Sequence, residues 1–442
     1  MLKTVRNAFK IKDIRNKLLF TFMVLIIVRL GSQLPVPGVN QAVIADWLQN
    51  NFGSGLSFLD SFTGGSFTRM SLFALGIGPY ITSSIIMQLL TIAIPKLEEM
   101  QKDGESGRKK IAEISRYVTI GLAIIESVAM VIGFSGSGAL EGGLNFTNIV
   151  VITASFTAGS AILMWLGERI TEKGVGNGIS VILLINIVAN MPSDIYGLIQ
   201  KFILGENVVK GVTAGIIIVA VILVSVVLII LLNAAQRKIA VQYAKKVQGR
   251  KMVGGQSSHI PLKVNTAGVV PVIFAVSIMQ FPIIIASFFG VQPARAYFWP
   301  KVLYMLNSQN WFDIQNGAFK YTVGVVIYMA LIVFFAYFYT SITFNPMEVA
   351  NNMKKQGGFV PGIRPGKPTT EYLTKVLNYI IFIGAIGLML VAIIPIFFSG
   401  VFDANVSFSG TSLIIVVSVV LETMKQVESQ MLVRHYKGFL ND

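Results

Sequence analysis

Few residues in this chain have types and spacings suited to covalent chemistry. Cysteine is absent, which excludes a thiolate nucleophile, a disulfide and a thiolate metal site. His259 and His435 fall outside the apolar runs and form no metal-binding pair, and no H-E-x-x-H zinc motif occurs. The glycine-rich run 174–178 lacks dinucleotide-binding spacing, and 362–367 resembles a phosphate loop only loosely. The sequence therefore predicts no enzyme, no cofactor and no metal site, so energy for any directed process must come from a partner.

The clearest ionisable group inside an apolar segment is the carboxyl of Glu126. A charge at membrane depth costs roughly 3 kcal/mol on insertion scales and usually marks function. Neighbouring apolar segments offer Thr82, Ser83 and Gln88, and a later one begins beside Asn265. These groups could hydrogen-bond to one another across an internal seam between helices. A structural hydrogen-bond cluster and a gated seam explain them equally well.

The composition indicates which elements position these groups. The 442 residues are 54% hydrophobic and only 13% charged, against about a quarter charged in a soluble domain. A helix needs roughly 20 apolar residues to cross a bilayer, and ten such stretches fill most of the chain. They are 18–34, 71–94, 117–134, 149–166, 179–199, 211–232, 267–290, 321–342, 376–398 and 411–431. The first has no small-residue cleavage site after it, so we expect it to be retained as a helix rather than removed as a signal peptide.

The charges divide unequally between the two sides that these ten helices define. If the N-terminus is cytoplasmic, the cytoplasmic segments hold 29 of the 36 Lys and Arg residues and 13 of the 21 acidic residues, a net charge of +16. The external segments then carry a net charge of −1. The positive-inside rule describes this asymmetry, and shifting the helix count by one would destroy it. We therefore predict an all-α, multi-pass membrane protein with both termini in the cytoplasm.

A short connection after the fifth helix divides the chain into residues 1–200 and 201–442, with five helices each. Because five is odd, two similar halves would face opposite ways across the membrane. Many transport proteins place their pathway between such inverted repeats. The helix count permits this arrangement, but no convincing residue-level repeat supports it, so the residues alone leave inversion open.

Residues 55–69, between the first two predicted helices, could form one short helix. Its apolar residues stand at helical spacing and a glycine pair follows them: Leu56, Phe58, Leu59 and Phe62, then Gly64 and Gly65. Ten residues reach about 15 Å, which is too short to cross the bilayer. A surface loop and a movable stopper both fit this pattern, and the residues alone favour the loop.

Two predicted cytoplasmic connections, 236–263 and 350–372, are strongly basic. Their most exposed-looking cations are Arg237, Lys238, Lys245, Lys246, Arg250 and Lys251 in the first and Arg364 in the second. Positive loops can simply obey the topology rule. They could also dock a polyanion such as ribosomal RNA, or an acidic protein surface. Both interpretations stay open at this point.

Several long segments together resemble the SecY family of protein-conducting channels. These segments are ALGIGPYI at 74–81 through QLLT at 88–91, MWLGERITE at 164–172 through Gly178-Ile179-Ser180, LKVN at 262–265 through Pro271, FVPGIRPG within 359–366, and GTSL at 410–413. The resemblance spans essentially the whole chain. It implies a clam-shell of two inverted five-helix halves, hinged between the fifth and sixth helices. It also implies an hourglass pore with a lateral gate, where helices 2 and 3 face helices 7 and 8.

The resemblance also implies roles for particular residues. The pore constriction maps to Ile77, Ile81, Ile179, Leu183, Ile273 and Ile415. The polar cluster of the lateral gate maps to Thr82, Glu126 and Asn265, and the plug maps to 55–69, which reverses the preference for a plain loop. An apolar ring excludes ions by dewetting, and it has no fixed hydrogen-bond pattern that would reject a passing sequence.

Partners and place follow from the same resemblance. SecE is expected to clamp the two halves, with SecG peripheral, and the basic loops, Arg364 foremost, to dock the SecA motor ATPase or the translating ribosome. The implied substrate is an unfolded preprotein whose signal sequence enters the lateral gate in the bacterial plasma membrane. Two other classes compete: an ion-coupled secondary transporter, for which one acidic residue is thin support, and a membrane-embedded enzyme.

Overall fold

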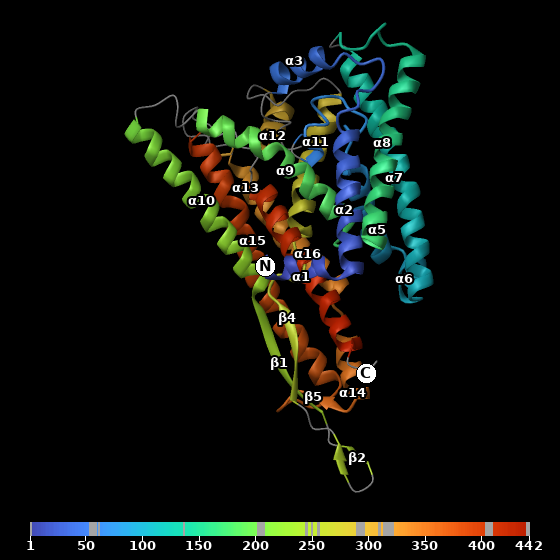
Figure 1. The fold of residues 1–442 in the computed structure, drawn as a ribbon, viewed down its shortest axis with the longest axis vertical. Helices are drawn as coiled ribbons and strands as arrows, with labels where there is room; N and C mark the ends of the chain where they lie inside the picture. Colours follow the sequence, from blue (N-terminus) through green and yellow to red (C-terminus); the bar gives the residue numbers. More distant parts are fainter. Residues whose placement is uncertain are drawn as a thin grey trace.

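The structure consists mainly of long helices beside one another, with a small β-structure at one end (Figure 1). This computed structural model describes residues 2–52, 60, 62–135, 138–200, 208–243, 246–248, 251–253, 257–288, 297–307, 311–312, 322–402 and 410–438. One helix overlaps each of the ten predicted apolar stretches. They are α2 (Lys12–Gly31), α5 (Gly78–Ala93), α7 (Glu105–Phe134), α8 (Phe146–Lys173), α9 (Gly178–Ile199), α10 (Val208–Ala234), α11 (Val270–Phe288), α13 (Val323–Thr343), α15 (Lys367–Phe402) and α16 (Gly410–Gly438). The shorter helices are α1 (Leu2–Lys10), α3 (Gln41–Phe52), α6 (Pro95–Lys102), α12 (Phe298–Leu306) and α14 (Pro346–Lys355).

Length and composition identify membrane-spanning candidates among these helices. Within the described ranges, six are long and apolar enough: α7, α8, α9, α10, α13 and α15. The pair α5 and α6 also qualifies as one span, although the two are bent by 100° where Pro95 begins α6. Helix α11 is apolar but shorter, α2 carries charged residues in its first and last turns, and α16 carries them in its C-terminal half. The chain therefore has the helices of a multi-pass membrane protein.

The second predicted helix starts later than its apolar run predicts. The run begins at residue 71, but Ser71 forms an isolated β-bridge with Pro35, 72–77 form turns, and α5 starts at Gly78 with Pro79 in its first turn. Gly76 has a φ of +58°, a left-handed conformation that glycine adopts without strain. The chain therefore turns just before α5, and Ile77 stands at the entrance of the helix.

The predicted loop at 236–263 contains a β-hairpin. Strand β1 (Gln236–Tyr243) pairs antiparallel with β4 (Ser257–Lys263) and, at its end, with β5 (Gly358–Phe359), while β2 (Lys246–Gln248) pairs with β3 (Lys251–Val253). Ile239, Val241 and Leu262 are buried against residues of α14 and α15. The sheet joins the two basic connections at the end of the molecule opposite α3 and α12 (Figure 1).

The long helices pack as two groups. The first helix group is α2, α5, α7, α8 and α9, and the second helix group is α10, α11, α13, α15 and α16; neighbours within each group contact one another. The groups meet where α16 contacts α9 and α2, and where α7 contacts α11. A large apolar core fills the second group, and Ile85 of α5 is buried in it. The seam between the groups is therefore closed by packing.

We expect Gly159→Ala to destabilise the protein, because a methyl group at Gly159 of α8 would overlap the carbonyl oxygen of Leu72. Overpacking of this kind costs about 1–3 kcal/mol. The test is the thermal unfolding midpoint in detergent. Gly197→Ala is the matched control, because a methyl group there meets nothing within 4 Å. Equal midpoints for the two variants would contradict the close approach of α8 to residue 72.

Candidate pore and gate

The six residues predicted to form the constriction come from both helix groups. Ile77 and Ile81 lie at the start of α5, Ile179 and Leu183 lie on the first turns of α9, Ile273 is on α11, and Ile415 is on α16. The first four belong to one apolar cluster and the last two to a second. Ile77, Leu183 and Ile415 are buried, at 2%, 4% and 0% exposure.

Phe62 connects these two apolar clusters. Its ring packs against the cluster of Ile77 and Leu183 and also against the cluster of Ile415. Ile81 and Ile273, from opposite helix groups, both pack against the core of the second group. The predicted ring residues thus lie in apolar clusters that Phe62, a residue of the predicted plug, connects.

The predicted plug is described in part. Leu56, Phe58 and Leu59 lie outside the described residues, whereas Phe62, Gly64 and Gly65 lie within them. Gly64 and Gly65 have φ values of +67° and +82°. The backbone therefore turns sharply after Phe62, in a conformation that favours glycine.

Three polar side chains of the first helix group donate hydrogen bonds to main-chain carbonyls of this segment. Arg29 Nη1 donates to Gly64 O at 3.1 Å, Asn186 Nδ2 to Phe62 O at 3.0 Å, and Asn190 Nδ2 to Asp60 O at 3.1 Å. Sequence analysis did not single out these contacts. One signal in the sequence could have indicated them: Arg29, Asn186 and Asn190 are polar residues within apolar runs, and the two asparagines are four residues apart.

The carboxylate of Asp60 accepts hydrogen bonds from within the same segment. Its Oδ1 accepts hydrogen bonds from Thr68 N at 3.1 Å and Thr68 Oγ1 at 2.9 Å. Burial raises the pKa of Asp60, while the bonds from Thr68 and the charge of Arg69 act in the opposite direction. Arg69 itself donates to Gln33 Oε1 at 2.6 Å. The bonds from Thr68 therefore tie Asp60 to the end of the plug segment, and the bond from Arg69 ties that end to Gln33.

The three residues predicted to form a polar cluster at the lateral gate lie on α5, α7 and just before α11. Among the described residues, no hydrogen bond joins Thr82, Glu126 and Asn265. Asn265 donates instead to Asn233 Oδ1 at 2.9 Å, and Asn233 donates to Ser418 Oγ at 2.7 Å. Asn265 therefore ties the start of α11 to α10 and α16 within the second helix group.

The predicted docking cations lie at the β-structured end of the molecule. Arg237 and Lys238 are exposed on β1, and Lys246 and Lys251 lie on β2 and β3. Lys245 and Arg250 fall outside the described residues. All of these positions belong to the connection 236–263. The sheet joins this connection to the loop that carries Arg364.

Arg364 occupies an exposed, well-braced turn between β5 and α15. Pro361 and Pro365 flank it, and Thr369 Oγ1 donates to the Arg364 carbonyl at 2.8 Å. Over the described part of the chain, its guanidinium makes no ion pair or hydrogen bond. It is therefore a positioned cation with free donors.

Long apolar helices in two groups, with apolar side chains of both groups meeting at Phe62, define a multi-pass membrane protein. The SecY family model matches residues 71–424. The chain belongs to the SecY family.

Individual relatives agree over the full length. The Protein translocase subunit SecY of Halalkalibacterium halodurans is 43% identical over 449 residues, and that of Bacillus subtilis is 43% identical over 452 residues; both alignments cover 100% of each chain. SecY proteins are subunits of protein translocases and not enzymes, so the predicted absence of catalysis is confirmed. The same membership favours a channel subunit over an ion-coupled transporter.

Solved structures share the fold. A chain described as the structure of a protein conducting channel has a TM-score of 0.64 at 19% identity, covering 94% of this chain and 92% of that one. Sec61 in the canine ribosome-channel complex has a TM-score of 0.61 at 18% identity, with the same coverage. The predicted channel fold is therefore confirmed.

Proposed function

We propose that this chain is the central subunit of a channel that passes unfolded preproteins across the bacterial plasma membrane and releases transmembrane segments sideways into the bilayer. The observation that carries the proposal is the packing of Phe62 between apolar residues of both helix groups. In this account Ile77, Ile81, Ile179, Leu183, Ile273 and Ile415 form the constriction. Residues 55–69 form its plug.

The chemistry of the constriction suits an unspecific polypeptide substrate. Aliphatic side chains offer no hydrogen bonds to a hydrated ion, so a narrow ring of them dewets and blocks ions. The same side chains change rotamers and spread around a chain of any sequence, because they form no fixed polar contacts with it. Displacement of Phe62 is then the step that opens the pathway.

The lateral exit lies where α5 and α7 meet α11. Ile85 of α5 is buried in the core of the second helix group, and α7 contacts α11. An apolar signal segment can replace these contacts with its own. Thr82, Glu126 and Asn265 border the exit and tune the ease of opening, because polar groups facing lipid are costly. Residues 1–200 and 201–442 act as the two halves that part.

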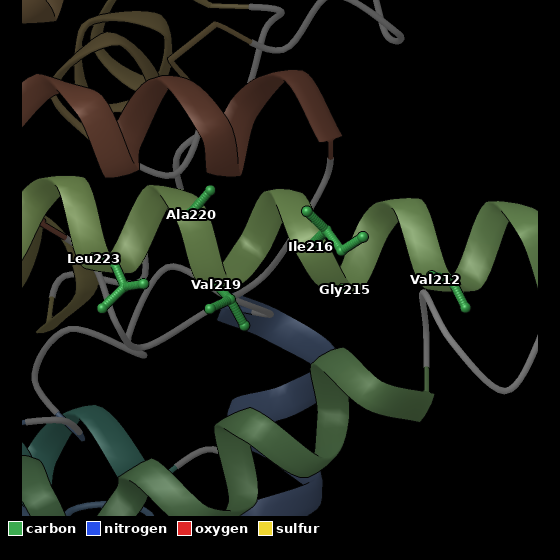
Figure 2. Close-up of a pocket in the computed structure, with 6 residues that line it drawn as sticks. All are labelled: Val212, Gly215, Ile216, Val219, Ala220 and Leu223. Carbon is green, nitrogen blue, oxygen red and sulfur yellow. The ribbon is translucent and has the colours of Figure 1, made fainter.

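The outer face of α10 suits a partner helix. It carries a hollow of about 500 Å³ with no polar lining side chain, and Figure 2 shows the residues that form it: Val212, Gly215, Ile216, Val219, Ala220 and Leu223. Small residues let two helix backbones approach closely in a membrane. We assign this face to SecE, which clamps the two halves, and place SecG at the periphery.

Energy comes from a cytoplasmic partner that binds the β-structured end. The guanidinium of Arg364, which makes no ion pair with a described residue, and the exposed cations of β1 support docking of SecA or of the ribosome. Two structures with this fold, canine Sec61 and yeast Ssh1, are described in complexes with ribosomes. The predicted cytoplasmic segments, which include these two connections and both termini, carry a net charge of +16, and this excess supports a cytoplasmic position for the docking end.

Reconstitution tests this function directly. Vesicles containing the chain with SecE and SecG receive SecA, ATP and an unfolded preprotein, and protease-protected preprotein is measured. We expect protection that requires ATP and an intact signal sequence. Equal protection in vesicles without this chain would contradict the proposal, and so would solute uptake driven by an ion gradient in place of preprotein transport.

A further inference from the structure

Three hydrogen bonds from the first helix group end on the main chain of the plug. The donors are Arg29, Asn186 and Asn190, and the acceptors are the carbonyls of Gly64, Phe62 and Asp60, which alternate along the segment. We infer that these three side chains form a latch that holds the plug closed by its backbone. This inference rests on the proposed function for its meaning, but the contacts are independent of it.

The two asparagines continue the pore-facing side of α9. Ile179, Leu183, Asn186 and Asn190 follow one another at intervals of three or four residues, so they lie along one face of the helix. Asn186 is only 2% exposed and Asn190 is half-buried. One face of α9 therefore supplies first the apolar constriction and then two amide donors directed at the plug.

The latch needs the glycine pair of the plug. A methyl group at Gly64 would come within 3.0 Å of the Cα of Asn186 and 2.5 Å of Arg29 Nη1. Both glycines also adopt left-handed conformations. Their lack of side chains lets the plug backbone reach the donors. Side chains elsewhere in the plug can vary without changing the carbonyls that are held.

The expected strength of the latch is moderate, which suits a gate. Each neutral hydrogen bond shifts an equilibrium by about fivefold, because water replaces the lost partner in the open state. Losing both asparagine donors therefore shifts the balance between docked and released plug by about 25-fold. The donors are positioning residues: they act through the plug and need not touch the substrate.

Hydrogen exchange of the resting channel measures this balance without any substrate. Exchange of a protected amide reports the local opening equilibrium of its segment. The complex of the full chain with SecE and SecG is held in lipid nanodiscs, and exchange of residues 62–70 is followed by mass spectrometry. We expect the double variant Asn186→Leu/Asn190→Leu to exchange this segment about 25-fold faster than the unmodified chain. Amides of α13 should be unchanged.

Two matched variants separate the donor from the shape of the helix. Asn190→Gln keeps an amide donor, so the plug amides should exchange more slowly in this variant than in Asn190→Leu. Ser193→Ala removes a hydroxyl on the same helix that, among the described residues, bonds to the carbonyl of Asn190 at 2.8 Å and to no plug residue, so this variant should leave plug exchange unchanged. Unchanged plug exchange in the double variant would overturn the latch, as would equal acceleration by Asn190→Gln and Asn190→Leu.

A failure of the latch can be distinguished from a failure of the proposed function. If the latch variants leave plug exchange unchanged while the unmodified complex transports preprotein, the latch is wrong and the function stands. If the unmodified complex transports nothing but the double variant accelerates plug exchange, the latch stands and the function is wrong.

Discussion

We expect Arg364→Glu to reduce SecA-driven preprotein transport by about a hundredfold, because removing one partner of a buried charge pair costs about 2–5 kcal/mol at an interface. Arg364 is exposed, free of ion pairs with described residues and held by a braced turn. A docking partner can therefore bury it at little ordering cost. The measurement is ATP-dependent protection of preprotein in vesicles, together with the affinity of SecA for them.

The matched control for this prediction is Lys354→Glu. Lys354 lies in the last turn of α14, is also exposed, and undergoes the same change of charge. If general electrostatic attraction alone guided the partner, both variants would lose activity to the same extent and the loss would shrink with salt. A loss confined to Arg364 supports a specific contact. Full transport by Arg364→Glu would remove this residue from the docking site.

The second large effect is expected at the plug, where Phe62→Ala should raise the ion leak of the resting channel about 30-fold. Phe62 is half-buried and packs against both apolar clusters. Truncating a fully buried phenylalanine costs about 3–5 kcal/mol, and we take about 2 kcal/mol for this partly exposed ring. Single-channel recording in planar bilayers without substrate measures this leak as the probability that the channel is open.

Phe67→Ala is the appropriate comparison. Phe67 lies five residues further on and is also half-buried, but it packs in a cluster of the first helix group with Met70 and Ala74. Its truncation should disturb that cluster and leave the contact between the two groups intact. A leak of equal size from both variants would mean that general loosening of the segment, and not the ring of Phe62, controls closure.

The helices were predictable because the bilayer imposes their length and apolarity. Each of the ten apolar stretches contains a helix, since unpaired backbone groups are not tolerated in lipid. The start of α5 was missed because the run 71–77 is apolar yet turns at Gly76. Apolar composition alone does not distinguish a spanning helix from a turn buried in protein.

The β-hairpin and the plug contacts were harder to foresee. Only Ile239 and Val241 of β1 are buried, so the alternation of buried and exposed residues along this strand is weak. Its basic residues therefore predicted a loop. Asn186 and Asn190 are visible as amides in an apolar run, but their acceptors are main-chain carbonyls 124 and 130 residues away. Sequence patterns indicate that such donors need partners, and the fold determines which partners they meet.

We expect the translocating polypeptide to pass between the predicted ring residues of this subunit. The absence of native cysteine allows a clean test by disulfide trapping. Cysteine is placed at Ile81 or Ile179 and in a preprotein stalled during transport, in vesicles containing the chain, SecE and SecA. We predict crosslinks at both positions that require ATP and SecA. Engaged preprotein that never crosslinks at either position would contradict the account, because the pathway would then lie elsewhere.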